Sequence, residues 1–150
     1  MSGQRLVHVS IEDDWEACAR FGEYEVSTRQ LTLDEAGYIH ASTASQLQLV
    51  LDLVYADLDL PLLLAVIDED ALAEAGVEVR WETSTHPSGR FGEVPRIMGV
   101  LPMEEPVIAG LIPLEKEDGR WVVPDLGGFN VRTSLRKLTP WIPRDIRVAA

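Results

Sequence analysis

The chain has 150 residues, the usual length of one domain, and 46% of them are hydrophobic. A domain of this length buries roughly 70% of the surface that its unfolded chain exposes, so it needs no disulfide or metal ion to fold. Its net charge of −12 opposes non-specific binding to nucleic acids and to anionic membranes, because both require cationic groups that neutralise phosphates. We therefore expect one folded domain that neither associates with a membrane nor binds nucleic acid non-specifically.

The cellular compartment is predicted from three features. The one cysteine, Cys18, cannot form an internal disulfide, and the helical pattern around it predicts a small core residue. The N-terminus lacks a basic stretch followed by a long apolar segment, so no signal peptide is expected. The longest apolar segment, residues 60–67, is too short to cross a bilayer. Together these features predict a cytoplasmic protein.

The predicted elements alternate between short strands and helices. Residues 5–9 form a first strand, and Ser10 is expected to cap the helix that follows, which has carboxylates in its first turn. A strand over residues 37–42 comes next, followed by a helix capped by Ser42 or Thr43. A buried strand over 62–67, a short helix over 68–75 and an alternating strand over 77–82 then follow. After them come a mobile loop over 83–93 and an extended segment over 94–101.

A hairpin is predicted near the end of the chain, where residues 107–114 and 120–123 are expected to pair across the turn at Asp118 and Gly119. Strands outnumber helices, and several strands follow one another without a crossover helix. This pattern favours an α+β fold, with mixed or antiparallel sheets and flanking helices, over a doubly wound parallel sheet.

The charge is distributed unevenly along the chain. Residues 1–119 hold 23 acidic and 7 basic residues, whereas residues 120–150 hold 2 acidic and 6 basic residues. We expect residues 1–124 to form the domain and residues 125–150 to be a basic, irregular extension that packs on its acidic body. The sequence leaves open that this extension meets a phosphate or docks on a protein partner, which it does not identify.

Two of the three histidines lie in predicted strands with the same local pattern. His8 precedes Ser10, and His40 precedes Ser42, by two residues, so each pair projects from one face of its strand. An imidazole beside a hydroxyl can hold a ribose hydroxyl or a phosphate, or exchange a proton near neutral pH. The alternative is that the histidines are hydrogen-bonded core residues and the serines are helix caps.

These segments resemble the domain-of-unknown-function 952 family over roughly residues 5–124. The matching motifs are Leu6-Val7-His8-Val9-Ser10, Asp14-Trp15, Gly37-Tyr38-Ile39-His40-Ala41-Ser42, Trp81-Glu82 and Pro95-Arg96-Ile97-Met98-Gly99-Val100-Leu101. The two histidine strands also resemble those of the RNA 2′-phosphotransferases, which belong to the ADP-ribosyltransferase superfamily. This second resemblance implies an ADP-ribosyltransferase-like fold.

The same resemblance implies a cleft that binds NAD, as a substrate, or a related nucleotide-ribose ligand. His8 would hold ribose hydroxyls, Tyr38 or His40 would flank the pocket, and His40 would help to shape it. Ser10 and Ser42 would project into it beside the histidines. The implied reaction is ADP-ribosyl transfer or hydrolysis of NAD at the nicotinamide-ribose bond.

One departure from the family pattern concerns Arg96, which stands where a histidine is usual. A guanidinium can clamp a phosphate but cannot transfer a proton near pH 7. Glu82 is the candidate carboxylate that would stabilise a cationic ribose, with Arg80 on the same strand face as its partner. The alternative for Arg96 is a salt bridge to Glu82 or Glu93.

The departure at Arg96 also favours a second hypothesis, a non-catalytic module that binds another small anion. Whether the chain is an enzyme therefore stays open. No metal site is expected, because the histidines lack the spacing of metal ligands.

Overall fold

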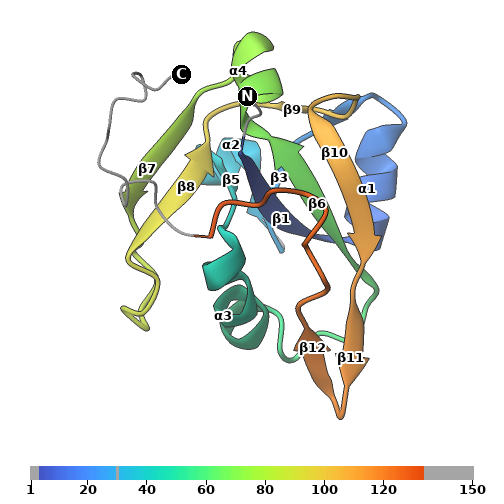
Figure 1. Ribbon diagram of the computed structural model, residues 1–150, viewed down its shortest axis with the longest axis vertical. Helices are drawn as coiled ribbons and strands as arrows, with labels where there is room; N and C mark the ends of the chain where they lie inside the picture. The colour runs from blue at the N-terminus through green and yellow to red at the C-terminus, as the bar shows by residue number, and fades with distance from the viewer. Residues whose placement is uncertain (1–3, 30, 134–150) are drawn as a thin grey trace.

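The computed structural model describes residues 4–29 and 31–133, which form a mixed α+β fold with several small antiparallel sheets and four helices (Figure 1). In the central sheet, β1 (Arg5–Ile11) and β10 (Ile108–Pro113) both run antiparallel to β6 (Leu62–Asp68). The first six residues of β6 are buried, because the strand lies in the middle of a sheet that is covered on both faces. The continuous apolar run at 62–67 correctly predicted this buried strand.

A second sheet carries most of the residues singled out in the sequence. Its order is β5-β8-β7, and both pairings are antiparallel. The strands are β5 (Ile39–His40), β7 (Val79–Thr83) and β8 (Glu93–Ile97). In this register, His40 on one side and Arg80 on the other both lie opposite Arg96.

Two backbone hydrogen bonds join the sheets directly beside the histidines. The amide of Val7 donates to the carbonyl oxygen of Ser42 over 3.0 Å, and the amide of Ser42 donates to that of Val7 over 2.8 Å. The chain therefore leaves β5 after two residues in order to pair with β1. This short bridge brings His40 next to His8.

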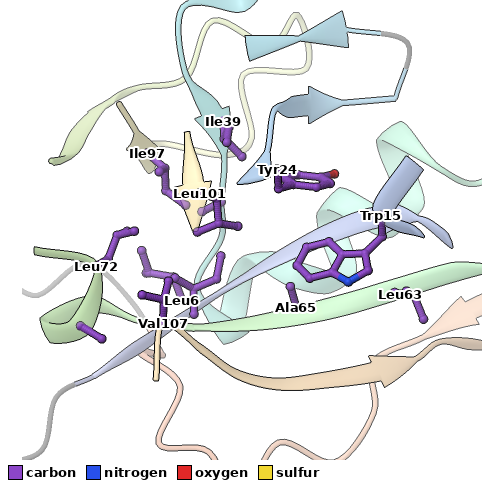
Figure 2. Packing of buried hydrophobic residues seen from close by; sticks show 13 residues of the cluster. Leu6, Trp15, Tyr24, Ile39, Leu63, Ala65, Leu72, Ile97, Leu101 and Val107 are labelled. Carbon is purple, nitrogen blue, oxygen red and sulfur yellow. The ribbon is translucent and has the colours of Figure 1, made fainter. Parts of the chain in front are cut away.

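One face of the central sheet is covered by a cluster of large apolar side chains (Figure 2). Leu6 and Ile67 pack there against Trp15 of α1 (Glu12–Ala19). Tyr24 lies beside Trp15, with a centroid separation of 4.9 Å. Tyr24 belongs to β2 (Glu23–Tyr24), which pairs with β9 (Leu101–Pro102).

The opposite face of the sheet packs against α3 (Ala44–Val54) and a small hairpin. Leu47 and Leu51 of the helix contact Val7 and Val9 of β1 in one buried cluster. Because adjacent strand residues point to opposite faces, Leu6, His8 and Ser10 are on the side away from α3. The remaining elements are β3 (Val26–Thr28), β4 (Leu31–Thr32), α2 (Leu33–Ala36), α4 (Glu69–Glu74), β11 (Glu115–Glu117) and β12 (Arg120–Val122).

Two predicted local assignments were wrong or incomplete, and a third, the cap of α3, is confirmed. Ser10 does not cap α1, because pairing with β6 continues through Ile11, which is the N-cap. The strand predicted over 37–42 is confined to β5. Thr43, one of the two expected caps, forms the capping box of α3 with Gln46.

The predicted hairpin has a different first strand. Residues 108–113 pair with β6, and it is β11 that pairs with β12. The turn itself was correctly placed, because Asp118 and Gly119 have φ values of 53° and 79°, as a type I′ turn requires.

The first residues of the predicted C-terminal extension contact the domain. Val131 forms a parallel bridge with Arg5, and the guanidinium of Arg132 donates two hydrogen bonds to Glu69. Residues 134–150, which complete the extension, lie outside the described part of the chain. Among the described helices, none is both long and apolar enough to cross a membrane.

Candidate functional site

A cavity of about 580 Å³ lies where the two sheets meet. Its lining residues come from β1, β3, β5, β8, α3 and the loop between β7 and β8. This volume falls within the range of roughly 300 to 1,000 Å³ that is typical of small-molecule pockets. The cavity is therefore large enough for a metabolite rather than only for water.

The lining is rich in hydrogen-bond donors and in positive charge. Arg29, Arg96 and all three histidines of the chain line the cavity, together with several hydroxyl side chains. No aspartate or glutamate is among the described residues that line it, although the chain has 25 acidic residues. The side chains that line the cavity thus include basic residues and no acidic ones, and each of the two arginines pairs with a carboxylate outside the lining, Arg29 with Asp57 at 2.7 Å and Arg96 with Glu82 at 2.6 Å.

His8 is held by protein groups through both ring nitrogens. Its Nδ1 lies 2.5 Å from the carbonyl oxygen of His40, and its Nε2 lies 2.9 Å from the Tyr24 hydroxyl. That hydroxyl in turn lies 2.8 Å from Oγ of Ser10. Because a carbonyl oxygen only accepts hydrogen bonds, Nδ1 carries the proton of the neutral ring.

Burial lowers the pKa of His8 to about 4. The side chain is therefore neutral near pH 7. With both nitrogens engaged, His8 positions β5 against β1 more readily than it exchanges a proton with a ligand.

The ring of His40 is part of a stack that ends at Arg96. The rings of Tyr38 and His40 meet edge to face at 4.9 Å, and the Arg96 guanidinium lies over the Tyr38 ring at 4.4 Å. Burial, and then the positive charge of Arg96, lower the pKa of His40. The stack therefore holds one fixed positive charge and one neutral imidazole at the cavity.

Comparison with known proteins decides the family. The family described as "Protein of unknown function (DUF952)" matches residues 9–108. The chain belongs to this family. The motifs around His8 and His40 had correctly indicated it.

A crystal structure of protein CC0527 from Caulobacter crescentus is similar to this DUF952 protein, with a TM-score of 0.63 and 19% identity. The match covers 83% of this chain and 96% of that one. A double mutant of the same protein matches with a TM-score of 0.62 and 18% identity. These likenesses show a shared fold, and no curated protein matches the sequence.

Three of the predicted site residues of the DUF952 protein are not among those that line the cavity. Ser10 is buried behind His8, where it contacts Tyr24. Arg80 is exposed and pairs with Glu78 at 3.0 Å, not with Glu82. Glu82 is 45% exposed and accepts a 2.6 Å hydrogen bond from Nη1 of Arg96, which is one of the two salt bridges expected for that arginine.

Sequence reasoning missed one wall of the cavity and a part of its rim. Ser27, Thr28 and Arg29 belong to β3 and its end, a segment in which no site residue was predicted. His86 and Phe91 come from the loop predicted over 83–93, where their rings meet edge to face at 5.2 Å. The one signal for these residues was the run of polar side chains that interrupts the apolar pattern after residue 26.

No three His, Cys, Asp or Glu side chains gather into a candidate metal site within the described ranges. What the cavity offers is hydrogen-bond donors, among them those of two arginines that are each paired with a carboxylate outside the lining.

Proposed function

We propose that the cavity binds a small organic anion, and that this ligand is a nucleotide-ribose compound of the ADP-ribose or NAD class. The observation that supports the proposal is the donor-rich, carboxylate-free lining in a chain of net charge −12. A lining without carboxylates does not repel an anionic ligand at short range, and two arginines in it can bind one.

Arg96 is the residue best suited to bind the anionic group. Its side chain is only 12% exposed, so its charge is less screened by water than that of a surface arginine. Nη1 donates to Glu82. Because a guanidinium has five N–H donors in a planar fork, further donors are left for a phosphate. A phosphate at Arg96 would therefore meet a partly desolvated, oriented donor.

The apolar part of the lining suits an uncharged ring. Val50, Leu53 and Val54 of α3 contribute aliphatic side chains, and Phe91 of the loop contributes an aromatic one. A base or nicotinamide ring packed there would bury apolar surface, which is favourable by about 25 cal/mol per Å². The combination of an apolar wall with a cationic one supports a ligand that joins a ring to a phosphate.

Transfer or hydrolysis at the nicotinamide-ribose bond is a second candidate function, supported by the contact between Glu82 and Arg96. A ligand phosphate that binds Arg96 would compete with Glu82 and free its carboxylate, which could then stabilise a cationic ribose. Binding without reaction is better supported, because Glu82 is outside the cavity lining and both nitrogens of His8 are occupied. Release of nicotinamide from NAD would support the reaction.

Calorimetric titration of ADP-ribose and NAD tests the proposed function. We expect both ligands to bind the wild-type protein, and R96Q to weaken the binding about 10- to 100-fold, because hydrogen bonds to a charged group contribute about 1.5 to 3 kcal/mol. The matched control is R80Q, which removes the same charge from the residue opposite Arg96 but outside the cavity.

Two results of this titration would contradict the proposed function. One is the absence of heat with either ligand at millimolar concentration. The other is an equal loss of affinity in R80Q and R96Q, because it would assign the effect to overall charge rather than to the cavity.

A further inference from the structure

Ser27 has an unusual environment for a serine. It is the middle residue of β3, it is fully buried, and it lines the cavity. Its Oγ has no hydrogen-bond partner among the residues that the structure describes. Buried hydroxyl groups are nearly always hydrogen-bonded, since leaving one unpaired costs free energy.

Two other buried hydroxyls, those of Ser10 and Thr43, follow the usual rule. Ser10 contacts Tyr24 and donates to the carbonyl oxygen of Ile11. Thr43 contacts the hydroxyl of Ser45 at 3.2 Å. Ser27 differs from Ser10 and Thr43 in that it lines the cavity, where a bound molecule could supply the missing partner.

Arg96 provides a second unpaired group at the same cavity. Its Nε is buried and has no partner in the described part of the chain, although Nη1 donates to Glu82. Ser27 is on β3 and Arg96 is on β8, and both strands are neighbours of β5. The two groups therefore come from different walls of one cavity.

We propose that Ser27 and Arg96 bind two different parts of one ligand. A guanidinium only donates and is always charged, so Arg96 binds an anionic group. A serine hydroxyl both donates and accepts, so Ser27 binds an uncharged polar group such as a hydroxyl, carbonyl or amide. This inference rests on the proposed function and adds Ser27 as the residue that recognises the uncharged part.

S27A tests this assignment, with ADP-ribose and inorganic pyrophosphate as probes. Pyrophosphate represents the anionic part alone. We expect S27A to weaken ADP-ribose binding about 3- to 10-fold, the usual effect of one lost neutral hydrogen bond, and to leave the affinity for pyrophosphate unchanged. Without ligand, S27A should unfold at the same temperature as the wild type or higher, because the substitution removes an unpaired hydroxyl.

The matched control is S10A, which removes a buried serine hydroxyl that has protein partners and does not line the cavity. We expect S10A to lower the unfolding temperature and to leave the affinity for ADP-ribose unchanged. If Ser27 acts only in the fold, S27A should behave in the same way as S10A.

The outcomes separate this assignment from the proposed function. If S27A lowers the unfolding temperature and binds ADP-ribose as the wild type does, the assignment of Ser27 fails while the proposed function stands. If ADP-ribose does not bind the wild-type protein, the proposed function and the assignment fail together. If S27A weakens both probes equally, Ser27 does not distinguish the uncharged part, and the assignment is wrong.

Discussion

His8 shows how a single buried residue links stability to pH. In the unfolded chain its imidazole takes up a proton near the ordinary pKa of 6.5, but in the folded protein burial lowers this pKa to about 4. The folded state therefore favours the neutral ring. The resulting stabilisation is fully present above pH 6.5 and is lost as the pH falls through 4.

We predict that this residue alone accounts for about 3 kcal/mol of stability lost between pH 7 and pH 4, since one pKa unit corresponds to about 1.4 kcal/mol. Urea unfolding of the wild type and of H8Q at several pH values in this range measures the effect. H8Q should be less stable at pH 7, because it loses the hydrogen bonds of His8, but its stability should fall less steeply on acidification. Equal slopes for the two proteins would show that His8 does not titrate as described.

The candidate site was predictable where its residues lie in strands that follow a clear pattern. His8, His40 and Ser42 come together because residues of the two strands exchange backbone hydrogen bonds. The role of Ser27 could not be predicted, because the lack of a partner for a buried hydroxyl is a property of the folded molecule. The partner of Arg80 was assigned wrongly, because Glu78 and Glu82 are both two residues from Arg80 and the alternating pattern does not choose between them.

At the scale of elements, the segment after residue 124 is held against β10 by close packing. An added Cβ at Gly110 would lie 2.5 Å from Cε1 of the Phe129 ring, so a glycine is required there for the ring to fit. The same segment is fixed by a hydrogen bond from Nη1 of Arg5 to the carbonyl oxygen of Phe129. Gly110 thus lets residues 125–133 reach β1.

We predict that G110A destabilises the protein by about 1 to 3 kcal/mol, the usual cost of overpacking, because Phe129 must move away from β10. G128A is the matched control, since an added Cβ at Gly128 meets nothing within 4 Å. Denaturant unfolding measures both changes. A loss of stability in G128A as large as that in G110A would contradict the packing argument.

Elements with a strong local sequence pattern were predictable, whereas the strands that pair with them in the sheets were not. The apolar run of β6 and the turn at Asp118 and Gly119 were evident from the sequence alone. The strand over 108–113 was assigned to the hairpin instead of β6, because pairing between distant segments leaves no local pattern. Helix α2 was missed, since a single turn of four residues has no hydrophobic periodicity.

At the scale of the whole molecule, the acidic surface and the cationic cavity act on an anion in opposite directions. The net charge of −12 repels anions at long range, but this repulsion is screened beyond about 8 Å at physiological ionic strength. The contacts at Arg96 and the histidines are short-ranged and partly shielded from water. Selection of a ligand by this protein therefore depends on the cavity lining rather than on electrostatic steering.

The charge pattern also bears on the basic C-terminal extension. Its described residues contact the acidic body, where Arg132 pairs with Glu69 and lies 5.6 Å from the Trp81 ring. Glu69 is on α4 and Trp81 is on β7, and neither residue lines the cavity. Docking of the remaining extension on a protein partner stays a proposal.

The measurement that tests the account most directly is titration of ¹⁵N-labelled protein with ADP-ribose, followed by amide chemical shifts. The account predicts that residues 27–29, 38–42 and 84–96 shift together with one affinity, while the hairpin of β11 and β12 is unaffected. Shifts confined to residues 120–133, or none at millimolar ADP-ribose, would contradict it.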